Sequence, residues 1–334
     1  MKQLRYKNKP IGSLDSLART LGLSLSELEK VARSSETLYF PNKPIIKPNG
    51  KIRQTYTVKE PLFRIQKKIL EEIINGVDFP EYLQGSIKDP DLPRSYDRDA
   101  QLHAGREVIL KEDISGFFSS TRTELVHNVW KYFFNFPEDV ASILTKFTTY
   151  KDFIPEGAPT SPAIANLVFW NREPKLELEL REKGFLYSRY VDDITVSFVT
   201  RVSKGELQNV TTKIYGMINA YGLQPNRDKD ENGFLKKRVV RSKNKPMVVH
   251  GLNINSGRPT LPKKERYKIR AAVKELEVLV QSSTSWDEIK KSLDSVTGRV
   301  NMMKRLHSNE AQKYILKLNE IKKTIDARKA NIKN

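Results

Sequence analysis

Two adjacent aspartates, Asp192 and Asp193, interrupt a run of alternating bulky residues. The alternation predicts a β-hairpin with its turn at residues 191–193. A third carboxylate, Asp113, follows a short apolar run and is expected at the end of a strand. Carboxylates at a strand end and a hairpin tip can converge on two divalent cations about 4 Å apart, the arrangement that in-line phosphoryl displacement needs.

The aspartates also have a purely structural explanation, because Asp and Asn tolerate the positive φ angles of tight turns. The turn alone favours that explanation. Asp113, a Gly/Pro-rich loop between the carboxylate segments and a strongly basic chain together favour catalysis. In that chemistry, one metal ion lowers the pKa of an attacking 3′-hydroxyl and the other neutralises the leaving pyrophosphate.

The charge balance indicates a polyanionic partner. The 334 residues contain 59 Lys and Arg against 40 Asp and Glu, a net charge of +19. Residues 261–334 alone hold 18 Lys and Arg against 9 Asp and Glu, a net of +9. Nucleic acid is the expected partner. The alternative is a basic surface that serves solubility alone.

The composition excludes several kinds of site. With no cysteine, the chain has no disulfide, thiolate metal site or Cys nucleophile, and four histidines leave little for a His-rich zinc site. A catalytic metal would therefore use oxygen ligands, which suits magnesium or manganese. No run of about 18 apolar residues and no apolar leader segment is present, so we expect a cytoplasmic protein without a membrane span.

Local patterns predict the elements that position these residues. Residues 13–33 predict two short helices, the first between Ser13 and Gly22 and the second with a Ser24/Glu27 capping box. A Pro-Asn-Gly turn predicts a hairpin with Lys51 and Arg53 just past it. Leu62, Ile65, Ile69 and Ile73 predict the buried face of a helix that ends at Gly76.

Further along the chain, Thr121 and Glu124 predict a helix start, and Ser161 with Pro162 predicts a helix that runs to Gly184. A helix over residues 204–222 and a strand over 247–255 follow. From residue 261 onward the pattern is basic and helical, which predicts a separable helical lobe.

Six segments resemble those of reverse transcriptases, and within that group those of the bacterial retron type. Each segment is weak alone, but their order and spacing are specific: "NGKIR", "ILKEDISGFFS", "EGAPTSPAIAN", "YVDD", "YGLQPNRDK" and "VHGLNIN". The resemblance implies an α+β right-hand polymerase. Its fingers and palm, an antiparallel sheet plus helices, would occupy residues 40–257, and a basic α-helical thumb residues 258–334, after an N-terminal helical element at 1–39.

The resemblance also implies an activity and its partners. Such an RNA-directed DNA polymerase uses dNTPs to copy part of its cognate structured noncoding RNA. Synthesis starts from the 2′-hydroxyl of a guanosine and yields a branched RNA–DNA molecule (msDNA) used in phage defence. A separately encoded effector protein is a further expected partner, and no membrane is involved.

Site residues carry over by position. The resemblance implies that two Mg²⁺ ions, or Mn²⁺, are held by Asp113, Asp192 and Asp193 together with Ile114. It places Lys51 and Arg53 against the incoming triphosphate and makes Phe118 the sugar gate. It puts Glu156 and Gly157 in the nucleotide loop and makes Lys229 a proton donor to pyrophosphate, although the Lys229 segment is equally a solvated charged turn.

RNA contacts are expected at two segments that mark retron enzymes and in the basic lobe. Asp99-Ala100 and His103 stand where the retron pattern has Asn-Ala-x-x-His, and Val249-His250-Gly251 stands where it has Val-Thr-Gly, so each segment departs at one residue. His103 is alternatively a histidine satisfied within the protein. The basic lobe contributes Lys263, Lys264, Arg266 and Arg270.

Glu156 also departs from the family pattern, which has Gln. A carboxylate facing a triphosphate is repelled by about 1 kcal/mol or more at ~4 Å unless a cation compensates. We therefore predict that Glu156 pairs with Lys51 or Arg53. A catalytically silent RNA-binding scaffold is disfavoured, since it gains nothing from three carboxylates facing a polyanion. The sequence does not separate a retron from another bacterial defence or group II intron-like reverse transcriptase.

Overall fold

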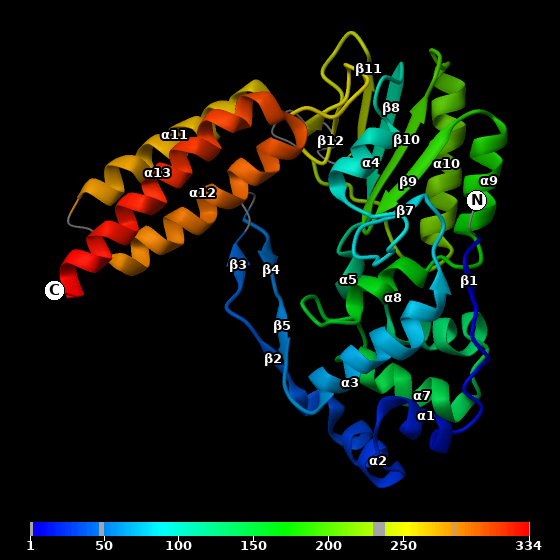
Figure 1. Cartoon of the computed structure of the whole chain (residues 1–334). Helices are drawn as coiled ribbons and strands as arrows, with labels where there is room; N and C mark the ends of the chain where they lie inside the picture. Colours follow the sequence, from blue (N-terminus) through cyan, green and yellow to red (C-terminus); the bar gives the residue numbers. More distant parts are fainter. Residues whose placement is uncertain (1–2, 47–49, 230–237, 283–284, 334) are drawn as a thin grey trace. The chain divides into compact units, whose positions relative to one another are not determined.

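The structure, a computed structural model, describes residues 3–46, 50–229, 238–282 and 285–333 (Figure 1). The chain divides into two compact units, residues 1–242 and residues 243–334. Across the part of the chain that the structure describes, no helix combines the length and the apolar character needed to cross a membrane.

A five-stranded sheet forms the centre of the first unit. Its spatial order is β11-β8-β10-β9-β7, and every pairing is antiparallel except that of β7 with β9. The predicted strand before Asp113 and the predicted hairpin are both confirmed. The strands are β7 (Leu83–Gln84), β8 (Val108–Asp113), β9 (Leu186–Tyr190), β10 (Asp193–Phe198) and β11 (Val239–Ser242).

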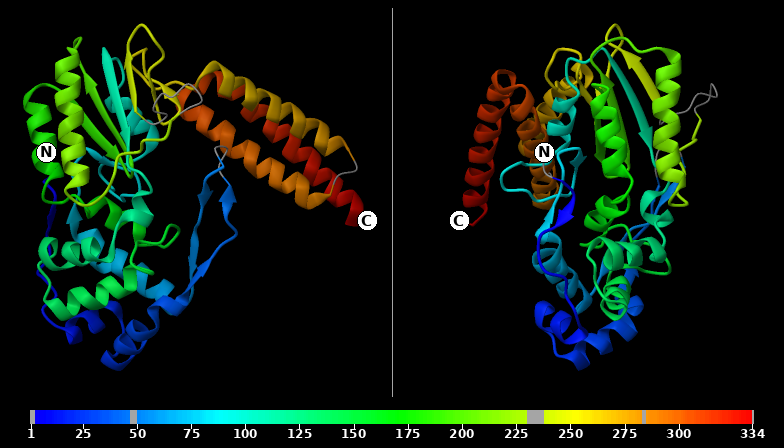
Figure 2. Two further views of the ribbon diagram at one scale, coloured as in Figure 1. Left: turned by 180° about the vertical axis from the view of Figure 1, so that it is seen from behind. Right: turned by 90° about the vertical axis from the view of Figure 1, so that its right-hand side faces the viewer.

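Helices cover both faces of this sheet (Figures 1 and 2). Consecutive residues of a strand point to opposite faces. Ser188 of β9 bonds His103, which follows α4 (Tyr96–Leu102), whereas Arg189 bonds Glu173 of α9 (Glu173–Glu182). Helix α10 (Lys204–Asn219) packs beside α9. The central strands are therefore buried on both sides, and the side chains of Ile194, Val196 and Phe198 are fully buried.

The N-terminal helices follow their local signals. Ser13 caps α1 (Leu14–Leu21), Gly22 ends it at φ 69°, and the predicted Ser24/Glu27 capping box begins α2 (Leu25–Ser34). The apolar face predicted for the next helix is also confirmed. Its four residues, Leu62, Ile65, Ile69 and Ile73, are at most 1% exposed. This helix is α3 (Leu62–Lys68), continued by a π-helical turn (Ile69–Ile73) and a 3-10 turn (Ile74–Gly76).

The predicted basic hairpin is present as two short ladders. Its strands are β2 (Tyr39–Pro41), paired with β5 (Tyr56–Val58), and β3 (Ile45–Ile46), paired with β4 (Ile52–Arg53). The Pro-Asn part of its turn lies outside the described residues. We call residues 39–58 the basic hairpin. Other elements of this unit are β1 (Arg5–Tyr6), β6 (Val77–Asp78), a 3-10 turn (Ser35–Leu38), a π-helical turn (Val129–Phe133) and α7 (Glu138–Thr148).

Helices begin near both predicted starts, but the two predicted N-cap residues are wrong. The hydroxyl of Thr121 donates to the carbonyl of Phe117 at 2.7 Å, because a one-turn helix, α5 (Phe117–Ser120), precedes it. The next helix, α6 (Thr123–Asn128), has Arg122 at its N-cap. Similarly, the Ser161 hydroxyl donates to the carbonyl of Pro155 at 2.7 Å and does not cap its helix.

The single helix predicted from Ser161 to Gly184 is two helices. The structure has α8 (Ser161–Leu167), a turn, and then α9, whose second residue is Pro174. Proline has no backbone N–H and clashes with the preceding turn, so it kinks or breaks a helix at an interior position. The same residue is tolerated in the first turn of a new helix.

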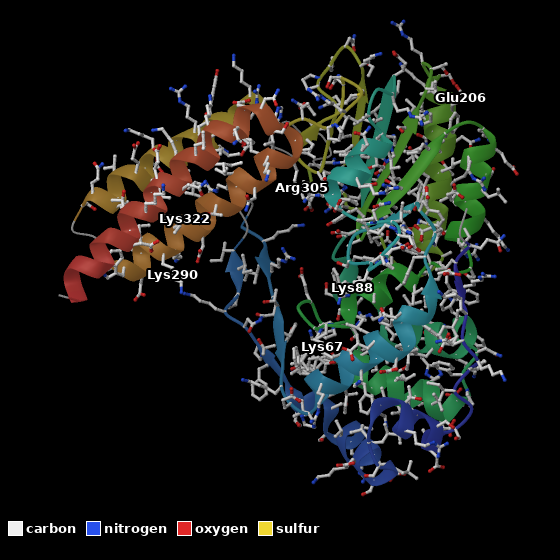
Figure 3. The ribbon with its side chains drawn as sticks, in the orientation of Figure 1. Lys67, Lys88, Glu206, Lys290, Arg305 and Lys322 are labelled. Atoms are coloured by element: carbon white, nitrogen blue, oxygen red, sulfur yellow. The ribbon has the colours of Figure 1, made fainter. Side chains whose placement is uncertain are left out.

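The second unit holds a hairpin and three long helices. The segment predicted as one strand over residues 247–255 is a hairpin of β12 (Val248–Val249) and β13 (Leu252–Asn253), because His250 and Gly251 form its turn at φ 48° and 77°. The helices pack pairwise, and Lys290, Arg305 and Lys322 are exposed on them (Figure 3). They are α11 (Lys263–Gln281), α12 (Trp286–Leu306) and α13 (Ser308–Lys333).

Candidate active site

The three predicted metal-binding aspartates meet at one end of the central sheet. Asp113 ends β8 and is directly opposite Asp193, the first residue of β10. Asp193 also pairs with Tyr190, which leaves Val191 and Asp192 as the two turn residues. Asp113 is 5% exposed, whereas Asp192 and Asp193 are half-buried. Two of the three carboxylates are thus cross-strand neighbours and the third lies at the adjoining turn.

The backbone of this turn argues against the structural explanation of the aspartates. The residue with a positive φ is Val191, at 58°, and neither Asp192 nor Asp193 has one. Positive φ is strongly disfavoured for a β-branched side chain. The two aspartates are therefore not needed for the turn conformation. The residue that adopts the positive φ is Val191, whose β-branched side chain disfavours it.

Hydrogen bonds hold the aspartates in this arrangement. Asn226 donates from its side-chain amide to Asp113 Oδ2 and from its backbone to the Asp113 carbonyl, both at 2.7 Å. The backbone N–H of Ile114 donates to the Asp192 carbonyl at 3.1 Å. Asn226 is not among the predicted site residues, although it lies within the "YGLQPNRDK" segment that carries part of the resemblance.

The donor atoms fit a hard divalent cation. The three carboxylates and the backbone carbonyl of Ile114 would offer oxygen atoms, the ligand type that Mg²⁺ and Mn²⁺ prefer. Within the described residues, no group of three or more Asp, Glu or His side chains is placed so that it could hold a metal ion. The fit therefore rests on ligand chemistry and strand register.

The basic hairpin reaches this site through ion pairs. Arg53 Nε donates to Glu156 Oε1 at 2.6 Å, and Nη2 donates to the same oxygen, so the predicted pairing of Glu156 with a hairpin cation is confirmed. This hydrogen bond is the main cause that raises the pKa of Arg53, and the charge of Asp192 adds to it. Lys51 Nζ lies 2.6 Å from Asp228.

Gly157 allows close contact between the loop that carries Glu156 and the basic hairpin. Its φ is 103°, and a Cβ at this position would lie 2.6 Å from the Tyr56 carbonyl oxygen. The Tyr56 N–H donates to the Glu156 carbonyl at 2.8 Å. Phe118 is half-buried in α5, five residues after Asp113, and Lys229 is exposed beside Asp228.

The first retron-like segment lies inside the protein. The side chains of Asp99 and His103 are at most 1% exposed, and Ala100 is fully buried. The His103 ring nitrogens each lie 2.7 Å from a hydroxyl, Nδ1 from Ser197 and Nε2 from Ser188. His103 thus links β9 to β10, and its burial fits the alternative of a histidine satisfied within the protein. Direct RNA contact by these three side chains does not fit this placement.

The other predicted RNA-binding residues belong to the second unit. Val249 is buried, His250 is half-buried and Gly251 is exposed. Lys263, Lys264 and Arg270 are exposed at the start of α11. Arg266, by contrast, is half-buried and pairs with Glu310 at 2.6 Å.

Comparison with known proteins gives the family. Residues 45–254 match the model of the family described as "Reverse transcriptase (RNA-dependent DNA polymerase)". The chain is 33% identical over 273 residues to the retron Se72 reverse transcriptase of Salmonella heidelberg (strain 579083-10), covering 82% of this chain and 70% of the relative. It is 29% identical over 333 residues to the retron Ec48 reverse transcriptase of Escherichia coli, covering 96% and 79%.

The matched residues 45–254 include the strand that ends at Asp113, the loop that carries Glu156 and Gly157, and the hairpin that carries Asp192 and Asp193. A reverse transcriptase domain implies a right-hand polymerase fold, which agrees with the mixed helices and sheet described above. It also implies an RNA template, dNTPs and divalent metal ions. The chain belongs to the reverse transcriptases, as an RNA-directed DNA polymerase related to those of retrons.

Proposed function

We propose that this enzyme reverse transcribes part of a cognate structured noncoding RNA into a branched RNA–DNA molecule, msDNA. The observation that carries the catalytic part is the register of Asp113 against Asp193, with Asp192 in the adjoining turn. The names of the two relatives, both retron reverse transcriptases, support the choice of product.

The polymerase lobes are assigned from the family. We assign the basic hairpin to the fingers and the five-stranded sheet to the palm, within residues 40–257. Residues 258–334 form the thumb, and residues 1–39 form an N-terminal helical element. The thumb assignment is supported by the helical content and the net charge of +9 in residues 261–334.

In this proposal Asp113, Asp192, Asp193 and the Ile114 carbonyl hold two Mg²⁺ ions, with Mn²⁺ as an alternative. When bound, the ions activate the attacking 3′-hydroxyl and neutralise the leaving pyrophosphate. Asn226 orients the Asp113 carboxylate through the 2.7 Å hydrogen bond from its amide.

The remaining residues bind the incoming nucleotide. Arg53 and Lys51 supply positive charge for the triphosphate, and Gly157 lets the nucleotide loop approach the fingers. The Phe118 ring lies against C2′ of the sugar and leaves no space for a hydroxyl. Lys229 donates a proton to pyrophosphate.

RNA binding is assigned to the basic face of the thumb. Lys263, Lys264 and Arg270 are exposed there, and phosphate contacts with such side chains make affinity fall steeply with salt. A-form RNA is recognised largely by shape and phosphate contacts. We also propose a separately encoded effector and a role in defence against phage.

The branched product provides the test. Cells that carry the gene with its upstream flanking DNA should accumulate a small DNA joined to RNA through a 2′–5′ linkage. Treatment with a 2′–5′ debranching enzyme should shorten this species, and cells with the Asp192→Asn variant should lack it. DNA that is linear and extended from an RNA 3′ end would instead indicate a defence or group II intron-like enzyme of another type.

A further inference from the structure

A buried arginine lies directly behind the aspartate hairpin. Arg189 is in β9, two residues before Val191, and its side chain is fully buried. Its Nε donates to Glu173 Oε1 at 2.6 Å and its Nη2 donates to Glu173 Oε2 at 2.7 Å. A buried ion pair is weak evidence for a stabilising role, because the loss of hydration offsets the attraction. The pair therefore calls for another explanation.

The other N–H groups of Arg189 donate to backbone carbonyls of two elements. Nη1 donates to Val191 O at 2.9 Å and to Ala165 O at 3.4 Å, and Nη2 donates to Asn166 O at 3.1 Å. Val191 immediately precedes Asp192. Ala165 and Asn166 lie in the last turn of α8, where helix carbonyls lack partners within the helix.

The guanidinium also contacts the element that follows Asp113. It lies 6.0 Å from the centre of the Phe117 ring and 5.2 Å from that of Phe169, and these two rings are stacked at 5.7 Å. Phe117 begins α5, four residues after Asp113. One side chain thus contacts the turn at Val191, the last turn of α8 and the Phe117 ring at the start of α5.

We infer that Arg189 is a positioning residue that fixes Asp192 relative to α8 and to the Asp113 strand. This inference rests on the proposed catalytic role of Asp192. Val191 adopts a φ of 58° that its side chain disfavours, so the turn needs an external restraint, and the bond to its carbonyl supplies one. A planar guanidinium with five donors can serve Glu173 and three carbonyls together, whereas a lysine ammonium has three donors on a flexible stem.

Arg189→Lys keeps the positive charge for Glu173 and loses the simultaneous carbonyl contacts. Because small misplacements of reacting groups cost up to about 100-fold in rate, kcat for primer extension should fall about 10- to 100-fold. The Mg²⁺ concentration for half-maximal activity should rise. The KM for dNTP and the Kd for RNA should stay within about twofold, since their proposed contacts lie elsewhere.

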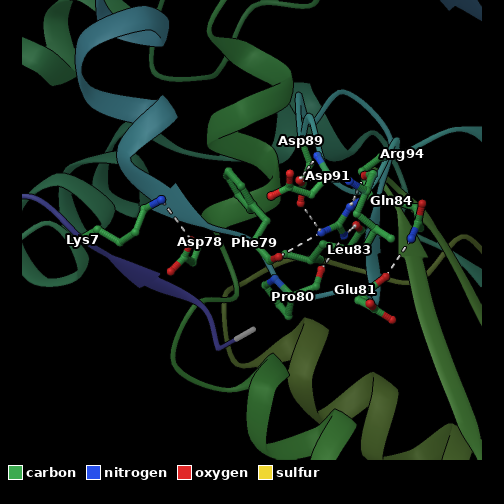
Figure 4. Close-up of polar contacts among 11 residues, drawn as sticks. Lys7, Asp78, Phe79, Pro80, Glu81, Leu83, Gln84, Asp89, Asp91 and Arg94 are labelled. Carbon is green, nitrogen blue, oxygen red and sulfur yellow. Dashed lines mark hydrogen bonds and ion pairs between the residues drawn. The ribbon is translucent and has the colours of Figure 1, made fainter. Parts of the chain in front are cut away.

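Arg94 offers a matched control (Figure 4). Its side chain is also fully buried, pairs with Asp89 at 3.2 Å, and donates to the carbonyls of Phe79, Pro80 and Leu83. These carbonyls lie outside the hairpin turn. Arg94→Lys should lower the melting temperature and leave kcat and the Mg²⁺ dependence unchanged.

A rescue variant separates positioning from stability. Glycine adopts a φ near 58° without strain, so Val191→Gly lessens the need for the restraint. Adding Val191→Gly to Arg189→Lys should recover part of the lost kcat. If Arg189→Lys does not fold, Tyr187→Phe takes its place, because the Tyr187 hydroxyl bonds Glu173 at 2.7 Å and steadies the pair. The kcat of Tyr187→Phe should then fall about two- to fivefold, with an unchanged KM for dNTP.

The outcomes distinguish this inference from the proposed function. Wild-type kcat and Mg²⁺ dependence in Arg189→Lys would overturn the inference alone, and so would an equal loss of kcat in Arg94→Lys. With Tyr187→Phe as the substitute, an unchanged kcat would overturn it. An active Asp192→Asn variant would overturn the catalytic assignment itself, and the inference with it.

Discussion

The ion pair between Arg53 and Glu156 gives a quantitative prediction for nucleotide binding. Both side chains are partly exposed, Arg53 at 48% and Glu156 at 24%, so water screens the attraction between them. Pairs of this kind contribute about 0.5–1 kcal/mol. That free energy corresponds to about a two- to fivefold change in affinity.

The direction of the change in the KM for dNTP follows from competition between Glu156 and the nucleotide for Arg53. Glu156 occupies the guanidinium that we propose binds the triphosphate, so a nucleotide must displace it. Glu156→Gln should release Arg53 and lower the KM for dNTP about two- to fivefold, with kcat unchanged within about twofold. Glu156→Lys places two cations together, which should disturb closure of the fingers and reduce activity.

Steady-state primer extension on an RNA template measures both variants. The difference in KM should shrink as salt rises, because screening weakens exposed charge pairs. Glu138→Gln is a control. Glu138 is the first residue of α7, and the variant removes a 2.7 Å ion pair with Lys131 that has no proposed role in nucleotide binding. If neither Glu156 variant alters the kinetic constants while the control behaves as wild type, the competition described above does not occur.

Three further predictions concern substitutions of single residues. Phe118→Ala should lower the ratio of deoxyribonucleotide to ribonucleotide incorporation, and an unchanged ratio would make Phe118 a packing residue. Gly157→Ala should reduce both activity and melting temperature, because its Cβ would lie 2.6 Å from the Tyr56 carbonyl at a φ of 103°; wild-type values for both would refute this. Burial, with the Arg266 charge, lowers the pKa of His307 below 6.5, and its neutral ring accepts the Leu261 N–H at 2.9 Å. This contribution to stability is present above pH 6.5 and is lost as the pH falls through the lower folded pKa, so His307→Gln should reduce the drop in melting temperature between about pH 7.5 and 5.5.

Local signals predicted much of the fold because the physics that they report is local. The capping residues Ser13 and Ser24 and the stop at Gly22 act on neighbouring backbone groups, and each is where the sequence indicated. The prediction of one helix from Ser161 to Gly184 is wrong because Pro174 interrupts an otherwise helical pattern. The break between α8 and α9 could therefore be predicted from the sequence.

The supports of the candidate site were harder to predict, because they depend on contacts between distant residues. His103 bonds hydroxyls 85 and 94 residues away, and Arg189 meets Glu173 only after α9 has turned back onto the sheet. No local pattern reports such pairs. The strained φ of Val191 is likewise invisible in the sequence, where the neighbouring aspartates are better suited to the turn.

The catalytic role of the hairpin aspartates is tested most directly by one substitution. Asp192→Asn removes one proposed anionic metal ligand at nearly constant size, in a half-buried turn residue whose φ is not positive. Primer extension by the purified variant on an RNA template with Mg²⁺ should yield no DNA product. The melting temperature and the affinity for RNA should match those of the wild type. Normal DNA synthesis by the folded Asp192→Asn variant would contradict the assignment of the active site.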